Sequence, residues 1–176
     1  MENIKITEFK KVLVANRGEI AIRVFRALDE LGIQTVGIYS KEDKYSLFRT
    51  KTDESYELDR TKGAIEAYLD IEGIIKIAKE KGVDAIHPGY GFLSENPDFA
   101  QACVDNGIAF IGPDRETMDA MGDKISSKRM AIECGVPIIP GIDHALRDEK
   151  EAVEAAAKIG YPVMLKSTAG GGGIGI

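Results

Sequence analysis

The sequence predicts a doubly wound α/β domain over residues 1–113, in which helices cover both faces of a parallel sheet. Short apolar runs alternate with segments of helical periodicity along this half of the chain, and short loops join them. A repeated strand–helix–strand order of this kind produces parallel strands with helices on both faces. The alternation stops after residue 113, so a second domain is expected over residues 114–176.

Each predicted strand is a short apolar run, rich in Val, Ile or Ala and ended by turn residues. These runs lie at residues 11–15, 34–39, 84–86 and 109–111. Apolar residues spaced three and four apart predict the helices between them, because that spacing places them on one helical face. The helices run through Ile20 to Leu31, Ile71 to Ala78 and Phe99 to Cys103. Gly32 and Gly82 follow the first two, where a left-handed cap belongs, and the polar residues 40–51 show no strong period.

In residues 114–176 the predicted strands and helices no longer alternate. Helical patterns are found at residues 115–121, 124–134 and 149–159. Two prolines, Pro137 and Pro140, keep residues 136–141 extended. Residues 161–166 predict a strand that runs into a run of consecutive glycines, Gly170, Gly171, Gly172 and Gly173.

Composition excludes several classes of function. Lys and Arg number 23 against 29 Asp and Glu, a net charge of −6, which argues against a nucleic-acid-binding protein with a basic face. No apolar run reaches the roughly 18 residues that a membrane span needs, and the first residues lack a secretory signal. Two cysteines make no disulfide framework, so the cytoplasm is the expected compartment. Two histidines without closely spaced cysteines predict no metal site.

The glycine run at residues 170–173 is the most informative candidate for a ligand site. Consecutive glycines after a strand leave backbone N–H groups available to an anion such as a nucleotide phosphate. Lys166, a charge at the end of an apolar strand, favours the same partner. A flexible linker with a snorkelling lysine is the alternative. Lys124 opens a helix, where the helix dipole favours a bound phosphate, although a lone lysine is commonly surface charge.

Two loops at the carboxyl ends of predicted strands form the other candidate region, since open α/β sheets bind ligands at that edge. Residues 16–21 lack the dinucleotide-binding glycine pattern, so a tight turn with Gly18 for close strand–helix packing is favoured. Residues 87–96 collect two glycines, a proline and several polar side chains. Considered one at a time, the histidine is explained as a structural residue, and the Ser or Asn as a helix cap. Arg23 and Arg26 lie off the apolar stripe of their helix and predict a solvated face.

Together these motifs resemble the biotin carboxylase component of biotin-dependent carboxylases. The matching stretches follow the family's order over nearly the whole chain, at residues 14–21 with Arg23, 87–96, 121–124 and 160–173. Residues 39–56 and 65–70 are similar to the pyruvate carboxylase type in particular. The chain departs from the pattern at Ile174 and Ile176, where the glycine loop of the family usually has Arg and Met.

The resemblance implies a Rossmann-like, pre-ATP-grasp domain followed by the start of an ATP-grasp domain, truncated in its glycine-rich loop. It implies a ligase that uses ATP, Mg²⁺ and bicarbonate to carboxylate biotin, which a partner carrier domain holds. In pyruvate carboxylase a carboxyltransferase domain then passes the carboxyl group to pyruvate. The full-length protein is expected to be a homo-oligomer without nucleic-acid or membrane partners.

The resemblance also implies roles for individual residues. The expected ATP-binding residues are Lys124, Lys166, Gly170, Gly171, Gly172 and Gly173. Tyr90 and Gly91 would face the biotin pocket, and Arg23 and Arg26 would lie near the dimer interface. The family's catalytic residues and metal ligands come after position 176, so this chain alone is not expected to catalyse carboxylation.

Two other hypotheses stay open at this stage. Another ATP-grasp ligase, such as a carbamoyl-phosphate or purine-pathway synthetase, would share the fold and the phosphate-binding glycines. The run at residues 87–96 argues against it, because that run is typical of biotin carboxylases. A non-catalytic, Rossmann-like interaction module with a glycine linker is the third hypothesis, which an absence of nucleotide binding would favour.

Overall fold

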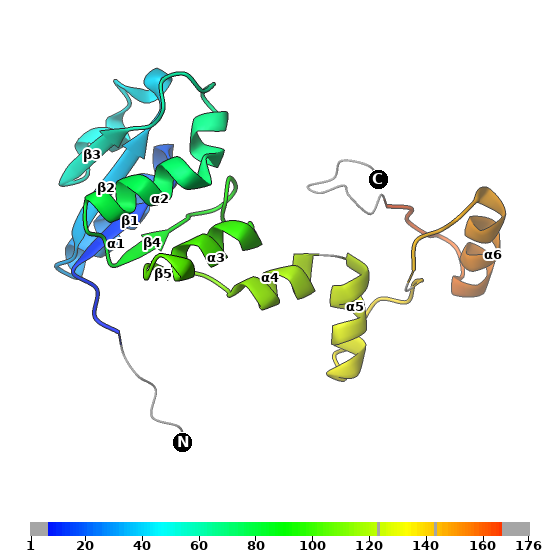
Figure 1. Ribbon diagram of the computed structural model, residues 1–176. Coiled ribbons are helices and arrows are strands. Elements are labelled where there is room, and N and C mark those ends of the chain that lie inside the picture. Colours follow the sequence, from blue (N-terminus) through cyan, green and yellow to red (C-terminus); the bar gives the residue numbers. More distant parts are fainter. Residues whose placement is uncertain (1–6, 123, 143, 167–176) are drawn as a thin grey trace. The chain divides into compact units, whose positions relative to one another are not determined.

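The computed structural model describes residues 7–122, 124–142 and 144–166 (Figure 1). The chain divides into two compact units, residues 1–118 and residues 119–176. The first unit contains all five described strands, and the described residues of the second unit form helices and extended segments. Within the described parts of the chain, no helix combines the length and the apolar character needed to cross a membrane.

The first unit is built on a parallel sheet of five strands. These are β1 (Lys11–Val14), β2 (Gln34–Tyr39), β3 (Glu54–Glu57), β4 (Ala85–His87) and β5 (Ala109–Phe110), in the order β3-β2-β1-β4-β5. The central strand β1 pairs with β2 on one side and β4 on the other, so that Val12 lies opposite both Thr35 and Ala85. The chain therefore winds outward from β1 in both directions, and the predicted doubly wound α/β fold is confirmed.

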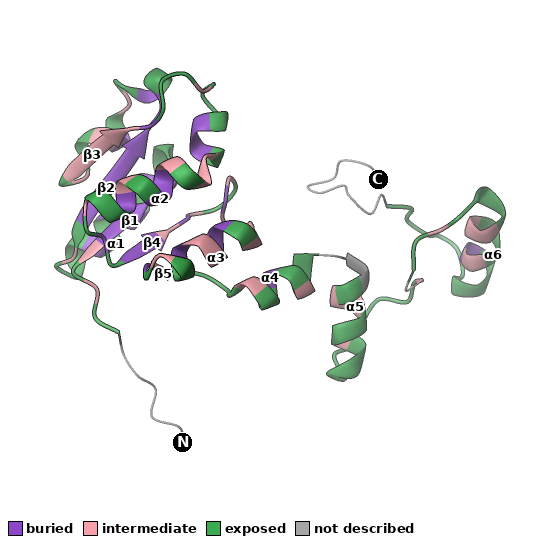
Figure 2. Cartoon of the chain, viewed as in Figure 1, coloured by how far each residue is buried: buried purple, intermediate pink, exposed green. Residues whose placement is uncertain are grey.

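Alternate side chains of the central strands enter two separate cores, as the two-residue period of a strand requires. Val12, Val14 and Ala85 lie on one face, which α1 (Gly18–Glu30) covers, whereas Leu13 and Ile86 lie on the other. The second face is covered by α2 (Ile71–Glu80) and α3 (Pro97–Asp105). Figure 2 shows the buried residues concentrated along the strands and along the sheet-facing sides of these helices.

Most predicted elements are present, but Leu31 is not part of the core that its spacing predicted. It follows the last residue of α1 as the cap and is 73% exposed. Gly32 and Gly82 adopt left-handed φ angles of 71° and 61°, as expected of residues that end helices. The polar stretch after β2 forms two short 3-10 helices, η1 (Lys41–Asp43) and η2 (Leu47–Thr50).

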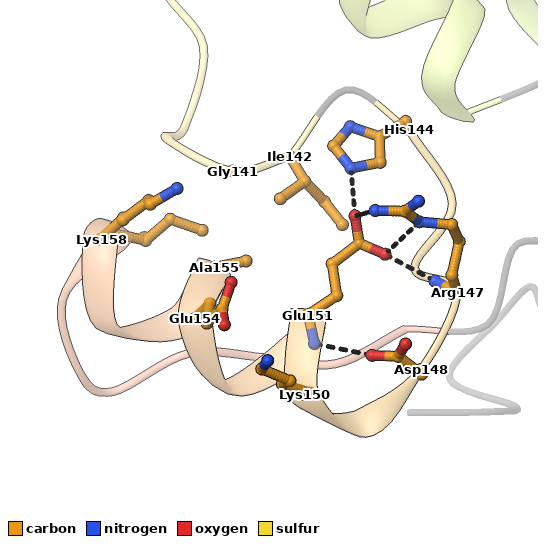
Figure 3. Close-up of a pocket in the computed structure, with 11 residues that line it drawn as sticks. Gly141, Ile142, His144, Arg147, Asp148, Lys150, Glu151, Glu154, Ala155 and Lys158 are labelled. Carbon is orange, nitrogen blue, oxygen red and sulfur yellow. Dashed lines mark hydrogen bonds and ion pairs between the residues drawn. The ribbon is translucent and has the colours of Figure 1, made fainter.

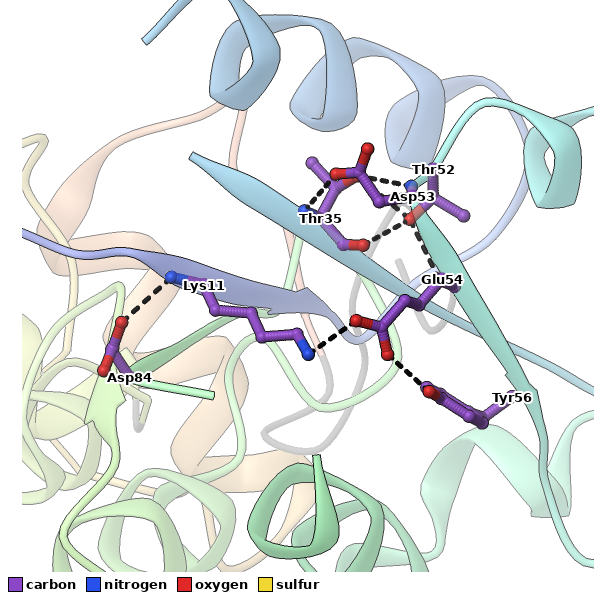
Figure 4. A network of polar contacts seen from close by, with 7 residues as sticks. All are labelled: Lys11, Thr35, Thr52, Asp53, Glu54, Tyr56 and Asp84. Carbon is purple, nitrogen blue, oxygen red and sulfur yellow. Dashed lines mark hydrogen bonds and ion pairs between the residues drawn. The ribbon is translucent and has the colours of Figure 1, made fainter. Parts of the chain in front are cut away.

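The edge strand β3 was not predicted, because polar contacts rather than an apolar run hold it to the sheet (Figure 4). The Lys11 ammonium lies 2.6 Å from a carboxylate oxygen of Glu54 on β3. Asp53, just before β3, accepts hydrogen bonds from the backbone N–H and the hydroxyl of Thr35 at 2.8 and 2.9 Å. These bonds hold the pKa of Asp53 below its usual value. Asp84 likewise accepts a 2.9 Å bond from the Lys11 backbone N–H and anchors the start of β1.

The second unit is described as helices and extended segments. Helix α4 (Arg115–Gly122) spans the division between the units, and α5 (Lys124–Glu133) and α6 (Glu149–Ile159) follow it. The predicted strand at residues 161–166 is wrong: these residues are exposed and form no strand. A β-strand is stable only when a neighbouring strand pairs with its backbone, and the described residues of this unit provide none. The glycines 170–173 lie outside the described residues.

Candidate functional site

The strand order reverses between β1 and β4, and the loops that leave their carboxyl ends lie together. The Ala15 backbone N–H donates a 2.9 Å hydrogen bond to the His87 carbonyl oxygen, which continues the pairing of the two strands into the loops. Open α/β sheets bind ligands in the crevice at such a reversal point, because the two connecting helices diverge there to opposite faces. The loops at residues 15–18 and 87–93 therefore form the candidate site of the first unit.

Asn16 joins these two loops from below the surface. Its side-chain amide nitrogen donates one hydrogen bond to the Pro88 carbonyl and another to the Tyr90 carbonyl, each 2.8 Å long. Its side-chain oxygen accepts a 2.9 Å bond from the Arg17 backbone N–H. Asn16 is only 2% exposed, so this buried amide has both of its donor hydrogens satisfied, as burial of a polar group requires.

The second loop takes a backbone path that glycine favours. Gly89 and Gly91 have φ angles of 68° and 67°, and Phe92 also has a positive φ, 43°. A Cβ atom on Gly89 would come within 2.7 Å of the Asn16 amide nitrogen, so a side chain would displace the hydrogen bonds of that amide. Phe92 is held in this uncommon conformation by its ring, which stacks on Tyr68 with centroids 5.0 Å apart.

Gly18 has a different role from the one predicted. An added Cβ there would meet no atom within 4 Å, so close strand–helix packing does not require a glycine. The φ angle of 61° at this position does require a glycine, because residues with a Cβ atom disfavour the left-handed region.

A buried polar network supports the loops from the side of β2. Asp43, 3% exposed, accepts hydrogen bonds from the Arg17 guanidinium, from the Tyr68 hydroxyl at 2.8 Å and from the Ser46 hydroxyl at 3.0 Å. The Tyr68 hydroxyl in turn accepts a 3.2 Å bond from the Ser40 backbone N–H. The network thereby connects the loop after β1, the 3-10 turns after β2 and the ring beneath Phe92.

The protonation states in this network follow from its hydrogen bonds. Burial alone raises the pKa of Asp43, but the bonds from Arg17, Tyr68 and Ser46 outweigh it, so that the pKa lies below its usual value. The same carboxylate raises the pKa of Arg17, and burial with the bond to Asp43 raises that of Tyr68. Asp43 is therefore ionised, Arg17 is charged and Tyr68 is neutral at pH 7.

His87 predicts a pH dependence of stability. Burial holds its pKa below the usual value, and its Nδ1 atom accepts a 3.0 Å hydrogen bond from the Gly89 backbone N–H. Because the unfolded chain then binds the proton more tightly, stability is expected to fall as the pH drops below about 6.5. Urea unfolding at about pH 7.5 and about pH 5.5 measures this dependence. The dependence should weaken in His87→Gln and persist in His144→Gln, the matched variant at the other histidine of the chain. An unchanged dependence in His87→Gln would contradict this explanation.

The structure brings together only some of the residues predicted to form sites. Tyr90 and Gly91 lie in the loop that Asn16 holds, and the Tyr90 side chain is 64% exposed, which leaves its ring accessible from solvent. Arg23 and Arg26 are exposed on α1, and Arg23 pairs with Glu19 one turn before it.

The predicted phosphate-binding residues belong to the second unit. Lys166 is exposed, and Lys124 begins α5. The Lys124 side chain and the glycines Gly170, Gly171, Gly172 and Gly173 lie outside the described residues. The described residues therefore place Tyr90 and Gly91 in an accessible loop at the carboxyl edge of the sheet. The biotin-facing role of these two residues and the nucleotide site both stay predictions.

A surface hollow of about 730 Å³ lies beside α6 (Figure 3), where no site residue was predicted. Glu151 within it accepts hydrogen bonds from the Arg147 backbone and guanidinium, and lies 3.2 Å from the His144 ring. Asp148 caps the start of α6 through the Glu151 backbone N–H. The hydrogen bonds from Arg147 lower the pKa of Glu151 to about 2. These side chains thus bind one another and fix the start of the helix.

Comparisons with known proteins agree with the geometry. The family of the biotin carboxylase N-terminal domain matches residues 8–118, and that of the carbamoyl-phosphate synthase L chain ATP-binding domain matches residues 123–176. The chain is 55% identical over 169 residues to pyruvate carboxylase of Staphylococcus aureus, covering 96% of this chain and 15% of that protein. It is 55% identical over 168 residues to biotin carboxylase of Halalkalibacterium halodurans, covering 96% of this chain and 37% of that protein.

Among solved structures, the biotin carboxylase domain of Hydrogenobacter thermophilus 2-oxoglutarate carboxylase has a TM-score of 0.88 at 50% identity. The match covers 95% of this chain and 36% of that one, which was crystallised as a dimer with MgADP and bicarbonate. The chain thus spans a minor part of the length of these relatives. Since the matched family covers most of the chain, including the sheet and both loops of the candidate site, the chain belongs to the family of biotin carboxylase N-terminal domains.

Proposed function

We propose that this chain forms the amino-terminal part of a biotin carboxylase of the pyruvate carboxylase type. The complete protein would use MgATP and bicarbonate to carboxylate biotin on a carrier domain, and a carboxyltransferase domain would pass the carboxyl group to pyruvate. The observation that carries the proposal is the loop at residues 87–93, which the buried Asn16 holds at the reversal point of the sheet with Tyr90 exposed. The 55% sequence identity of this chain to a pyruvate carboxylase and to a biotin carboxylase supports the same conclusion.

In this proposal each unit carries residues with a binding role of their own. Tyr90 and Gly91 face the biotin ring, and the accessible Tyr90 side chain supports that role. Lys124 and Lys166 bind ATP phosphates together with the glycines 170–173. The match of residues 123–176 to an ATP-binding domain supports this assignment. The cationic side chains would neutralise charge on the transferring phosphoryl group, and ATP and Mg²⁺ would supply the energy and charge for bicarbonate activation.

The remaining parts of the proposal concern the complete protein. The proposal assigns the catalytic residues and metal ligands to those parts of the longer relatives that this chain does not match, so the 176 residues alone are not expected to carboxylate biotin. Arg23 and Arg26, both exposed on α1, lie near a dimer interface in a cytoplasmic homo-oligomer. In the same proposal, the boundary between the pre-ATP-grasp and ATP-grasp domains lies between residues 113 and 114.

A chimaeric enzyme tests the proposed function. The chain replaces the matched 169-residue segment of Staphylococcus aureus pyruvate carboxylase, to which it is 55% identical. We expect the chimaera, prepared without biotin on its carrier domain, to form ADP much faster with bicarbonate and free biotin together than with bicarbonate alone. ADP formation that needs bicarbonate but ignores biotin would favour another ATP-grasp ligase, a candidate suggested by the match of residues 123–176 to a carbamoyl-phosphate synthase domain. The unmodified S. aureus enzyme is the positive control.

A further inference from the structure

The buried amide of Asn16 is not needed to complete the sheet. The pairing of β1 with β4 already ends in the hydrogen bond from the Ala15 N–H to the His87 carbonyl. The Asn16 amide lies one residue further on, and both of its donor hydrogens reach carbonyl groups of the other loop, those of Pro88 and Tyr90. Its structural effect is therefore on the path of that loop.

The loop would have other conformations available without this amide. Gly89 lies between the two carbonyls that Asn16 binds, and Gly91 follows them, each at a positive φ. Glycine reaches many backbone conformations at similar energy, so two nearby glycines make the carbonyl orientations poorly determined by themselves. Asn16 selects one of these orientations.

The position of the Tyr90 ring depends on that selection. Its side chain is 64% exposed, so core packing does not hold it. Its own carbonyl is one of the two groups fixed by Asn16, at 2.8 Å. On the other side of the loop, the ring of Phe92 is held by stacking on Tyr68. The backbone on both sides of Tyr90 is thus fixed from below while its ring stays accessible.

We propose that Asn16 is a positioning residue that sets the affinity for biotin through Tyr90. The inference rests on the proposed function of Tyr90 and adds to it the group that holds the tyrosine in place. A ring already positioned before the ligand arrives binds it without the entropic cost of ordering a glycine-rich loop. Asn16 itself, only 2% exposed beneath the loop, does not contact the ligand.

The sharpest substitution is Asn16→Asp, which keeps the size of the side chain and removes both donor hydrogens. The carboxylate oxygen that replaces the amide nitrogen would then face both carbonyl oxygens, those of Pro88 and Tyr90, and the loop would move away. In the chimaera we expect the KM for free biotin to rise about tenfold, the order of effect of a displaced positioning contact. The KM for ATP should change less than about twofold, because the nucleotide binds elsewhere. The kcat at saturating biotin should also change less than about twofold, because a loss of binding that is equal in the ground state and the transition state raises KM and leaves kcat unchanged.

A double-mutant cycle with Tyr90→Ala separates positioning from general loss of structure. If Asn16 acts through Tyr90, the double variant should have a KM for biotin close to that of Tyr90→Ala alone. If the two substitutions acted independently, their effects on the KM for biotin would multiply instead. Asn106→Asp is the matched control: the Asn106 amide donates a 2.8 Å bond to the Ala102 carbonyl in α3, away from the loop. It should leave the KM for biotin unchanged.

Gly89→Ala provides a second route to the same contact if Asn16→Asp fails to fold. The added Cβ would lie 2.7 Å from the Asn16 amide nitrogen, so it should raise the KM for biotin in the same selective way. An unchanged KM for biotin in the variants that fold, or effects that multiply in the cycle, would overturn the inference while leaving the proposed function intact. If ADP formation by the chimaera with the unsubstituted chain does not depend on biotin, both the inference and the proposed function would be overturned.

Discussion

Replacing Asp43 with alanine is expected to lower the free energy of unfolding of the first unit by about 3 kcal/mol, the low end of the range for breaking a buried ion pair. The substitution leaves the hydroxyl of Tyr68, which is 1% exposed, without its acceptor. It also removes the partner of Arg17, whose side chain is half exposed and can recover some hydration. Thermal or urea unfolding followed by circular dichroism measures the loss.

The contribution of the Asp43 charge to stability can be separated from that of the side-chain shape by the substitution Asp43→Asn. Because its pKa is lowered in the folded protein, the stabilisation by its charge is present above about pH 4 and is lost as the pH falls below that value. The difference in stability between the wild type and Asp43→Asn should therefore shrink in acid. Asp105→Ala is the matched control, since Asp105 is exposed and binds only Gln101 among the contacts described. A loss at Asp43 no larger than this control would contradict a stabilising role of the network.

Replacing Lys166 with alanine is expected to lower kcat/KM for ATP about 100-fold in the chimaera. A lysine that binds the transferring phosphates stabilises charge that increases toward the transition state, and removing one such group typically costs this much. A steady-state assay with varied MgATP measures the effect. Calorimetric titration of MgATP into the 176-residue chain and its Lys166→Ala variant shows whether the phosphate contact is made without the rest of the enzyme.

Lys158→Ala provides the control for Lys166. Both lysines are exposed and belong to the second unit, but Lys158 lies on α6, outside the motif that resembles the carboxylase family. Its substitution should leave kcat/KM for ATP unchanged. Equal effects of the two substitutions would show that Lys166 acts through general charge, and the phosphate assignment would then be wrong.

The elements predicted correctly are those whose sequence pattern and burial agree. Apolar runs predict β1 and β2 because both strands are buried on two faces, and helical spacing predicts α2 because one of its faces packs on the sheet. β3 was missed because an edge strand needs no apolar run: ion pairs and threonine–aspartate hydrogen bonds hold it instead. The strand at residues 161–166 was predicted from its apolar residues, but a strand also needs a partner.

The site could be predicted in part. The position of residues 87–96 after a buried strand predicted that this loop would lie at the carboxyl edge of the sheet, and it does so beside the loop that leaves β1. This could be predicted because parallel strand direction follows from the alternation of elements. Asn16 and Asp43 were not singled out, since their partners are distant in sequence: 72 residues separate Asn16 from Pro88, and 25 separate Asp43 from Tyr68. Only a signal that relates such distant positions could have shown that these side chains meet.

The formation of carboxybiotin by the chimaera tests the central claim most directly. Labelled bicarbonate, MgATP and free biotin are incubated with the enzyme, and acid-labile label bound to biotin is measured. If the chain is the amino-terminal part of a biotin carboxylase, labelled carboxybiotin should accumulate in step with ADP and should disappear when biotin or ATP is omitted. A folded chimaera that binds MgATP but transfers no label to biotin would contradict the claim.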